Sequence, residues 1–188
     1  MSMEKFAPDL YNMSEWALLR LFRVVTGLKL VYNPDLKRIS LITLDDVEDA
    51  IIETISDLVS AEFEIQIEPV GKPIEYRNST RGHFLNTSRL TSKLKKILPS
   101  DKETALMVVT NYWLSPTPFL LSRILHTIFP ILGITYLLDG ICYVTTLDGR
   151  LTKELIQFAA IHEVGHLLGL HGYPLTWLRK KKNREKEK

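Results

Sequence analysis

The residues best suited to chemistry lie in the segment HEVGHLLGLH, which occupies positions 162–171. His162 and His166 are four residues apart, so in a helix they lie one turn from each other on the same side, where both imidazoles can reach one metal ion. Zinc prefers tetrahedral coordination, and a catalytic zinc leaves one position for water. Glu163 adjoins the first histidine and is placed to accept a proton from that water. The pattern therefore predicts zinc-assisted hydrolysis with Glu163 as general base.

A third ligand, His171, requires the helix to end before it. In a continuous helix, at about 100° per residue, His171 would be rotated by about 140° from His166 and could not reach the same ion. Gly169 can adopt the left-handed conformation that ends a helix and reverses the chain. We therefore expect a structural turn at Gly169 that brings His171 to the metal held by the first two histidines.

The elements that must position this motif have an α/β pattern. The helix of the motif is expected at residues 153–168, with Thr152 as its N-cap. Asp139-Gly140 separates two runs of β-forming residues, 134–138 and 141–145, and this predicts a hairpin with a two-residue turn. Apolar periodicity further predicts strands at residues 38–44, 62–67 and 106–110, and helices at residues 14–27, 45–59, 86–97 and 119–129.

The zinc motif and the segments before it resemble a known group of enzymes. The pattern HExxHxxGxxH is the zinc signature of the metzincin metallopeptidases, and the upstream segments look like those of the archaemetzincin family. The resemblance covers roughly residues 39–172. The upstream segments are Ile74-Glu75-Tyr76, Arg81-Gly82-His83-Phe84, residues 85–94, and residues 106–110 with 111–114 after them.

This resemblance implies a metzincin-like α/β fold. In it, a twisted mixed sheet with an antiparallel edge strand packs on helices that include the zinc-binding active-site helix. A peptide substrate could add to the edge strand by main-chain hydrogen bonds. The residues that fit this substrate edge strand are Ile134, Thr135, Tyr136, Leu137 and Leu138.

The chain also departs from the archaemetzincin pattern after its third histidine. That family continues into four cysteines that hold a structural zinc, whereas this chain has no cysteine after Cys142. Metzincins place a methionine turn beneath the metal, and the last methionine here is Met107. We therefore expect one catalytic zinc ion, no second structural zinc, and a minimal lower half of the cleft.

Three regions are expected along the chain: an N-terminal extension (1–36) with a short helix, a metzincin-like catalytic domain (37–174) and a basic C-terminal tail (175–188). The extension's helix either packs on the catalytic domain or binds a partner or membrane surface. Residues 179–188 carry seven basic and two acidic side chains, so the net charge of +2 for the whole chain arises in the tail. The tail is either a disordered, solubilising end or a contact for an acidic partner, RNA or lipid surface.

The composition fits a soluble globular protein, with 45% hydrophobic and 24% charged residues. No signal peptide is recognisable at the start, and no transmembrane segment is expected. Cys142 is the only cysteine, which excludes an intrachain disulfide and a cysteine metal cage; it reads as a small core residue. A reducing, cytoplasmic location follows.

The sequence thus predicts a monomeric, cytoplasmic zinc metallopeptidase acting on a peptide or protein substrate. One alternative is a zinc-binding protein with little or no hydrolytic activity that serves as a peptide- or partner-binding module; another is hydrolysis of a non-peptide amide. Tyr173 is a candidate oxyanion stabiliser or a packed loop residue. His83 and His126 are expected to be structural or surface residues, and Asp148 to cap a helix or close a turn.

Overall fold

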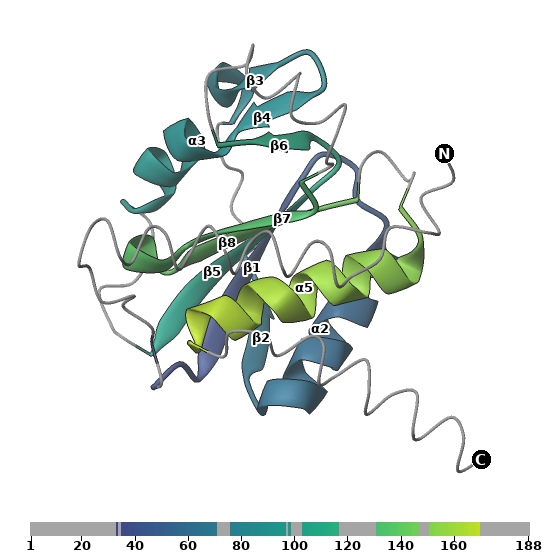
Figure 1. Cartoon of the computed structure of the whole chain (residues 1–188), viewed down its shortest axis with the longest axis vertical. Helices are drawn as coiled ribbons and strands as arrows, with labels where there is room; N and C mark the ends of the chain where they lie inside the picture. The colour runs from purple at the N-terminus through teal and green to yellow at the C-terminus, as the bar shows by residue number, and fades with distance from the viewer. Residues whose placement is uncertain are drawn as a thin grey trace, which may run out of the picture.

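The computed structural model describes residues 33, 35–70, 76–96, 98, 103–116, 131–146 and 151–169. A central five-stranded sheet has helices α2 and α5 on one face, and helix α3 with a small three-stranded sheet on the other (Figure 1). The elements, in chain order, are β1 (Arg38–Leu44), α2 (Asp49–Phe63), β2 (Gln66–Pro69), η2 (Arg77–Ser79), β3 (Thr80–Arg81), β4 (Phe84–Asn86), α3 (Thr87–Leu94), β5 (Thr104–Thr110), β6 (Trp113–Ser115), β7 (Gly133–Tyr136), η3 (Leu137–Asp139), β8 (Ile141–Thr145) and α5 (Lys153–Leu167).

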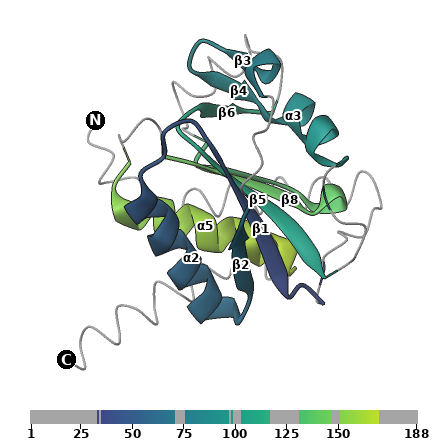
Figure 2. The same cartoon turned by 180° about the vertical axis from the view of Figure 1, so that it is seen from behind.

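The central sheet is mixed, and its antiparallel strand lies at one edge. The strand order is β2-β1-β5-β8-β7. Strands β2, β1, β5 and β8 run parallel to one another, whereas β7 runs antiparallel to β8. Seen from behind, the same twisted sheet separates α2 and α5 from the smaller sheet (Figure 2). This arrangement confirms the predicted α/β class and the antiparallel edge strand.

Side chains of the central strands alternate between two cores, one on each face of the sheet. Every residue of β5 is buried, as its continuous apolar run predicts. Met107 and Val109 pack on the face that carries α2 and α5. Leu106 and Val108 pack on the opposite face with the buried leucines of α3. The helices are therefore held on the sheet by apolar contacts that the two-residue period of a strand provides.

Helix α2 begins later than the sequence predicts. It starts at Asp49 rather than at Asp45, because Asp45 has a left-handed backbone conformation with φ 65°. Its carboxylate accepts a hydrogen bond of 2.5 Å from the hydroxyl of Tyr76, a residue far along the chain. The predicted first-turn position of Asp45 was therefore wrong, although the buried positions Ile55 and Val59 lie on the expected face.

The end of α2 also differs from the prediction. Phe63 was expected in a strand, but it is the last residue of the helix and packs against the core formed with α5. Glu64 then takes a left-handed conformation with φ 58°, and strand β2 begins at Gln66. The alternation of apolar and polar residues from 62 to 67 suggested a strand. Phe63 also fits the period of the helix, because it lies one turn after the buried Val59.

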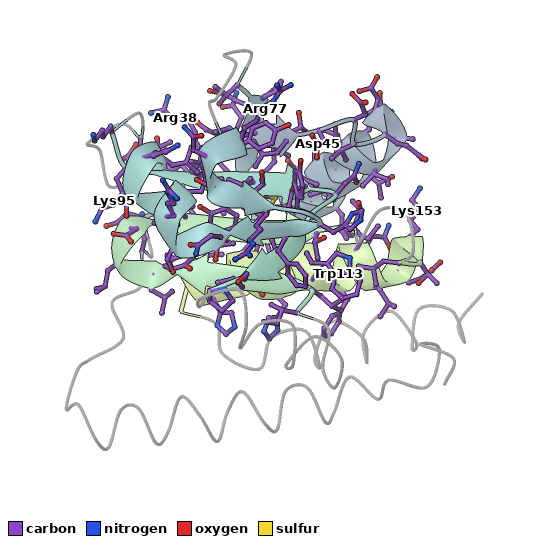
Figure 3. All side chains as sticks on the ribbon, turned by 90° about the horizontal axis from the view of Figure 1, so that it is seen from above. Arg38, Asp45, Arg77, Lys95, Trp113 and Lys153 are labelled. Atoms are coloured by element: carbon purple, nitrogen blue, oxygen red, sulfur yellow. The ribbon has the colours of Figure 1, made fainter. Side chains whose placement is uncertain are left out.

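The connection between β7 and β8 is longer than the predicted two-residue turn. Tyr136 pairs with Ile141, so residues 137–140 form the loop, with a turn of 3-10 helix closed by Gly140 at φ 62°. Leu137 and Leu138 therefore do not belong to the edge strand, and Leu138 is 80% exposed. An ion pair of 2.5 Å joins Asp139 in this loop to Lys95, which follows α3 and is labelled in Figure 3. This contact joins the loop to the end of α3.

Several predictions concern parts of the chain outside the described residues. They are the helices at 14–27 and 119–129 and the C-terminal tail. The proposed domain boundaries after residues 36 and 174 stay predictions. Within the described segments, no helix is long and apolar enough to cross a bilayer.

Candidate metal centre

Helix α5 carries three buried ionisable side chains in an otherwise apolar setting. The side-chain oxygen of Thr152 accepts a hydrogen bond from the backbone N–H of Leu155 and caps the helix, as predicted. From position 158 to 167 every residue is buried, because the helix packs on α2, β7 and β8. His162, Glu163 and His166 are only 3%, 2% and 8% exposed. Burying such groups costs free energy unless hydrogen bonds or a metal compensate, so this part of α5 is suited to a functional site.

The two histidines converge on one point. Their Nε2 atoms lie 2.9 Å apart, and their rings are nearly perpendicular, with centroids separated by 4.4 Å. Two nitrogens that bind a tetrahedral zinc at about 2.0–2.1 Å are about 3.3 Å apart. A shift of a few tenths of an ångström would therefore let His162 and His166 bind one ion. The ring of Phe158 stacks on that of His162 at a centroid distance of 5.9 Å and restricts its rotation.

The chain turns directly after these histidines. Helix α5 ends at Leu167, and Gly169 has a left-handed φ of 74°. The backbone N–H of Gly169 donates a 3.0 Å hydrogen bond to the carbonyl of His166. His171 follows two residues later and lies outside the described residues, as do Tyr173, His126 and Asp148. Among the residues that the structure does describe, no group of three or more His, Cys, Asp or Glu side chains could hold a metal.

The side chain of Glu163 is held against the edge strand β7. Its Oε2 atom lies 2.5 Å from the Oγ1 atom of Thr135. A Cβ atom on Gly133 would lie 2.4 Å from Oε1 and 2.5 Å from Cγ of Glu163, much closer than atoms can approach. The absence of a side chain at Gly133 is therefore what allows the carboxylate to reach this position.

Gly133 contributes to this arrangement, although the sequence did not single it out. Gly133 precedes the strand that the sequence predicts at 134–138, so no pattern marked it. In the structure it is the first residue of β7, and glycine in a strand allows the close approach of another group. Thr135 was singled out only as part of the predicted edge strand, and nothing in the sequence indicated its contact with Glu163. His83, by contrast, is exposed on the turn between β3 and β4, so of the two expected roles, structural or surface, it has the second.

Cys142 lies in β8 opposite Thr135, close enough to Glu163 to feel its charge. It is fully buried, and it pairs with Thr135 in the register of β7 and β8. Burial raises the pKa of its thiol well above the usual value, and the charge of Glu163 raises this pKa further. Cys142 is therefore a small core residue, as the sequence predicts, and stays protonated and inert.

The edge strand is anchored on its other face by hydroxyl groups. The hydroxyl of Tyr136 lies 2.7 Å from Thr87 Oγ1 and 2.9 Å from Ser88 Oγ, both in the first turn of α3. Tyr136 also packs edge-to-face on Tyr143 of β8. Strand β7 is thus fixed to α3 through Tyr136 and to α5 through Thr135, so its position relative to the two histidines is well defined.

Comparisons with known proteins support the fold. The archaemetzincin of Archaeoglobus fulgidus, solved in complex with malonate, has a TM-score of 0.50 and 16% sequence identity over 70% of this chain and 77% of its own. The present chain has an archaemetzincin-like fold. A zinc-dependent peptidase of Methanocorpusculum labreanum (strain Z) is 19% identical, with a TM-score of 0.48 over 70% of this chain and 81% of its own.

The archaemetzincin of Methanopyrus kandleri is 16% identical, with a TM-score of 0.48 over 75% of this chain and 78% of its own. No protein-family model and no curated protein sequence matches the chain. The likeness to the archaemetzincin of Archaeoglobus fulgidus confirms, for the fold alone, the resemblance that the sequence predicts.

Proposed function

We propose that this chain is a zinc-dependent metallopeptidase. The observation that carries the proposal is the convergence of His162 and His166 to 2.9 Å on a buried helix that also presents Glu163. The archaemetzincin-like fold adds support, because the antiparallel edge strand β7 lies beside this helix.

His162, His166 and His171 would hold one zinc ion, with the turn at Gly169 directing the third imidazole toward the first two. The chemistry that bound zinc supplies is Lewis acidity, which polarises the scissile carbonyl and lowers the pKa of the attacking water to about 7. Neutral imidazole is a good ligand for zinc, and three such ligands leave a position for water.

Glu163 would act as the general base. Its carboxylate accepts the proton of the attacking water and passes it to the leaving amine. Such proton transfer contributes about 10²- to 10⁴-fold to a rate. Tyr173 is the candidate donor to the developing oxyanion.

A peptide substrate would pair with the edge strand. Strand β7 covers positions 133–136, so the proposed docking segment is shorter than the predicted residues 134–138. Main-chain hydrogen bonds to an edge strand recognise an extended peptide irrespective of its sequence. The contacts of Thr135 and Tyr136 hold this strand in place relative to the metal ligands.

The wider predictions belong to the same proposal. They are a peptide or protein substrate, a single catalytic zinc without a second structural one, a monomeric chain, a cytoplasmic location, and a basic tail that is either a solubilising end or a contact for an acidic partner. Size-exclusion chromatography with light scattering would test the monomer, and removal of residues 179–188 would test the tail. We expect the shortened chain to retain its peptidase activity.

The central experiment combines metal analysis with a peptide library. The purified protein should contain about one zinc per chain, and His162→Ala or His171→Ala should lose most of it. His83→Ala is the matched control, since this exposed histidine lies outside the site, and it should keep the metal. Glu163→Gln should retain zinc but abolish cleavage of the library. Zinc binding without cleavage by either the wild type or Glu163→Gln would refute the peptidase and favour a binding module, and absence of zinc would refute both.

A further inference from the structure

The hydroxyl of Thr135 has two acceptors within reach, and both belong to Glu163. It lies 2.5 Å from the carboxylate Oε2 and 3.1 Å from the backbone carbonyl oxygen of the same residue. A hydroxyl has a single proton to donate. The shorter distance and the charge of the carboxylate direct it to Oε2, because O–H···O⁻ bonds of about 2.5–2.7 Å are roughly twice as strong as neutral ones.

The strand provides both a space and a donor for this carboxylate. Gly133 and Thr135 are two residues apart in β7, so they lie on the same face of the strand, toward α5. The missing side chain at Gly133 makes room for Glu163, and the hydroxyl at Thr135 then fixes the carboxylate. An ionised carboxylate has about four lone-pair sites, and the hydrogen bond from Thr135 occupies one of those on Oε2.

We propose that Thr135 is a positioning residue that fixes the carboxylate of Glu163 for its work as general base. This inference rests on the proposed peptidase function. Because Thr135 belongs to the strand that would pair with substrate, its hydroxyl links the substrate-binding strand directly to the base. The distance between the scissile bond and the proton acceptor is thereby held constant. A misplacement of about 1 Å in such a site can cost on the order of 100-fold in rate.

Threonine also favours strands through its branched side chain. The positioning role of Thr135 must therefore be distinguished from a role in the stability of the strand alone. Thr135→Val keeps the branched shape and removes only the hydroxyl, whereas Thr135→Ser keeps the hydroxyl and removes the methyl group. If the hydroxyl positions Glu163, Thr135→Val should lower kcat by about 10- to 100-fold with little change in KM or zinc content. Thr135→Ser should recover most of kcat. If strand stability were the reason, serine would be the more harmful substitution.

A second measurement needs neither zinc nor activity. In the metal-free protein, Thr135→Val should lower the urea midpoint of unfolding when Glu163 is present. The same substitution should have little effect in a Glu163→Met background, where the side chain has similar length but accepts no such hydrogen bond. Equal shifts in the two backgrounds would overturn the proposed contact. If Thr135→Val does not fold, Thr135→Ala serves for both measurements with the same expected direction.

The outcomes separate this inference from the proposed function. Cleavage of peptides by the wild type together with an unchanged kcat in Thr135→Val would refute the positioning role and leave the peptidase intact. Absence of cleavage by a zinc-loaded wild type would refute the peptidase and with it the role in catalysis. The effect of Thr135→Val on the urea midpoint, compared between the Glu163 and Glu163→Met backgrounds, would then still decide whether Thr135 holds Glu163.

Discussion

Replacing Gly133 by alanine tests the geometry of the candidate site most directly. The new Cβ would lie 2.4, 2.5 and 2.7 Å from Oε1, Cγ and Cδ of Glu163. Non-bonded carbon atoms are normally about 3.5–4.0 Å apart, so the overlap is about 1 Å or more at Cγ. Gly133 is not among the glycines with positive φ, and alanine is therefore compatible with its backbone. We expect the side chain of Glu163, rather than strand β7, to move.

The cost in stability should be moderate. Overpacking of a buried site costs typically 1–3 kcal/mol, and the lost charge-assisted hydrogen bond from Thr135 is worth about 1.5–3 kcal/mol. These costs overlap, because rotation of Glu163 relieves the clash by breaking the bond. Alanine also lowers the conformational entropy of the unfolded chain, which stabilises the folded state by about 0.4–1 kcal/mol. We expect a net loss of about 1–3 kcal/mol in the free energy of unfolding, or about 2–4 °C in Tm for each kcal/mol.

The cost in activity should be far larger. If Glu163 is the general base, as proposed, its displacement removes a contribution of about 10²- to 10⁴-fold. Gly133→Ala should then lose at least about 100-fold in kcat while it retains zinc. Urea unfolding, zinc analysis and cleavage of a library-derived peptide measure the three quantities separately.

The matched control is Gly82→Ala. Gly82 has φ 58°, and a Cβ there would meet no atom within 4 Å, so alanine should cost about 1–2 kcal/mol of backbone strain and leave kcat unchanged. A Gly133→Ala protein with nearly normal activity, or one no less active than Gly82→Ala, would show that Glu163 does not occupy the observed position during catalysis.

Three further predictions concern other parts of the fold. The thiol of Cys142, whose pKa is raised by burial, should react with a disulfide reagent on the order of 1000-fold more slowly in the native protein than in urea; rapid native labelling would contradict its burial. The hydrogen bond to Asp45 raises the pKa of Tyr76 to about 12 from 10.0; the stability from this contact should be present below pH 10 and disappear as the pH rises through 12, and ultraviolet titration of Tyr76→Phe should lack the corresponding phenolate step. The Asn86 side chain caps α3 by accepting a 2.8 Å bond from the N–H of Arg89, so Asn86→Ala should lower the unfolding free energy by about 1 kcal/mol in urea, and no measurable change would show that the cap is not formed in solution.

The sequence predicted best those features that depend on neighbours along the chain. The strand at Arg38–Leu44 and the cap at Thr152 followed from local pattern, because strand alternation and helix capping involve residues within a few positions. Predictions failed where a distant contact decided the local conformation. Asp45 was expected to open a helix, but its bond to Tyr76 accompanies a left-handed backbone instead. Phe63 was assigned to a strand, although the core that forms between α2 and α5 retains it in the helix.

The sequence by itself determined which side chains could meet on one turn of helix. His162 and His166 are four residues apart, and helix geometry alone brings their rings together. Only the tertiary structure decided where Glu163 would lie, because Gly133 and Thr135 are about 30 residues away and reach it through the pairing of β7 with β8. No periodic pattern in the sequence reveals such a contact, because the packing of a strand against a helix depends on the whole sheet. The proximity of the two histidines was therefore predictable from the sequence, whereas the contacts of Glu163 were decided by the tertiary structure.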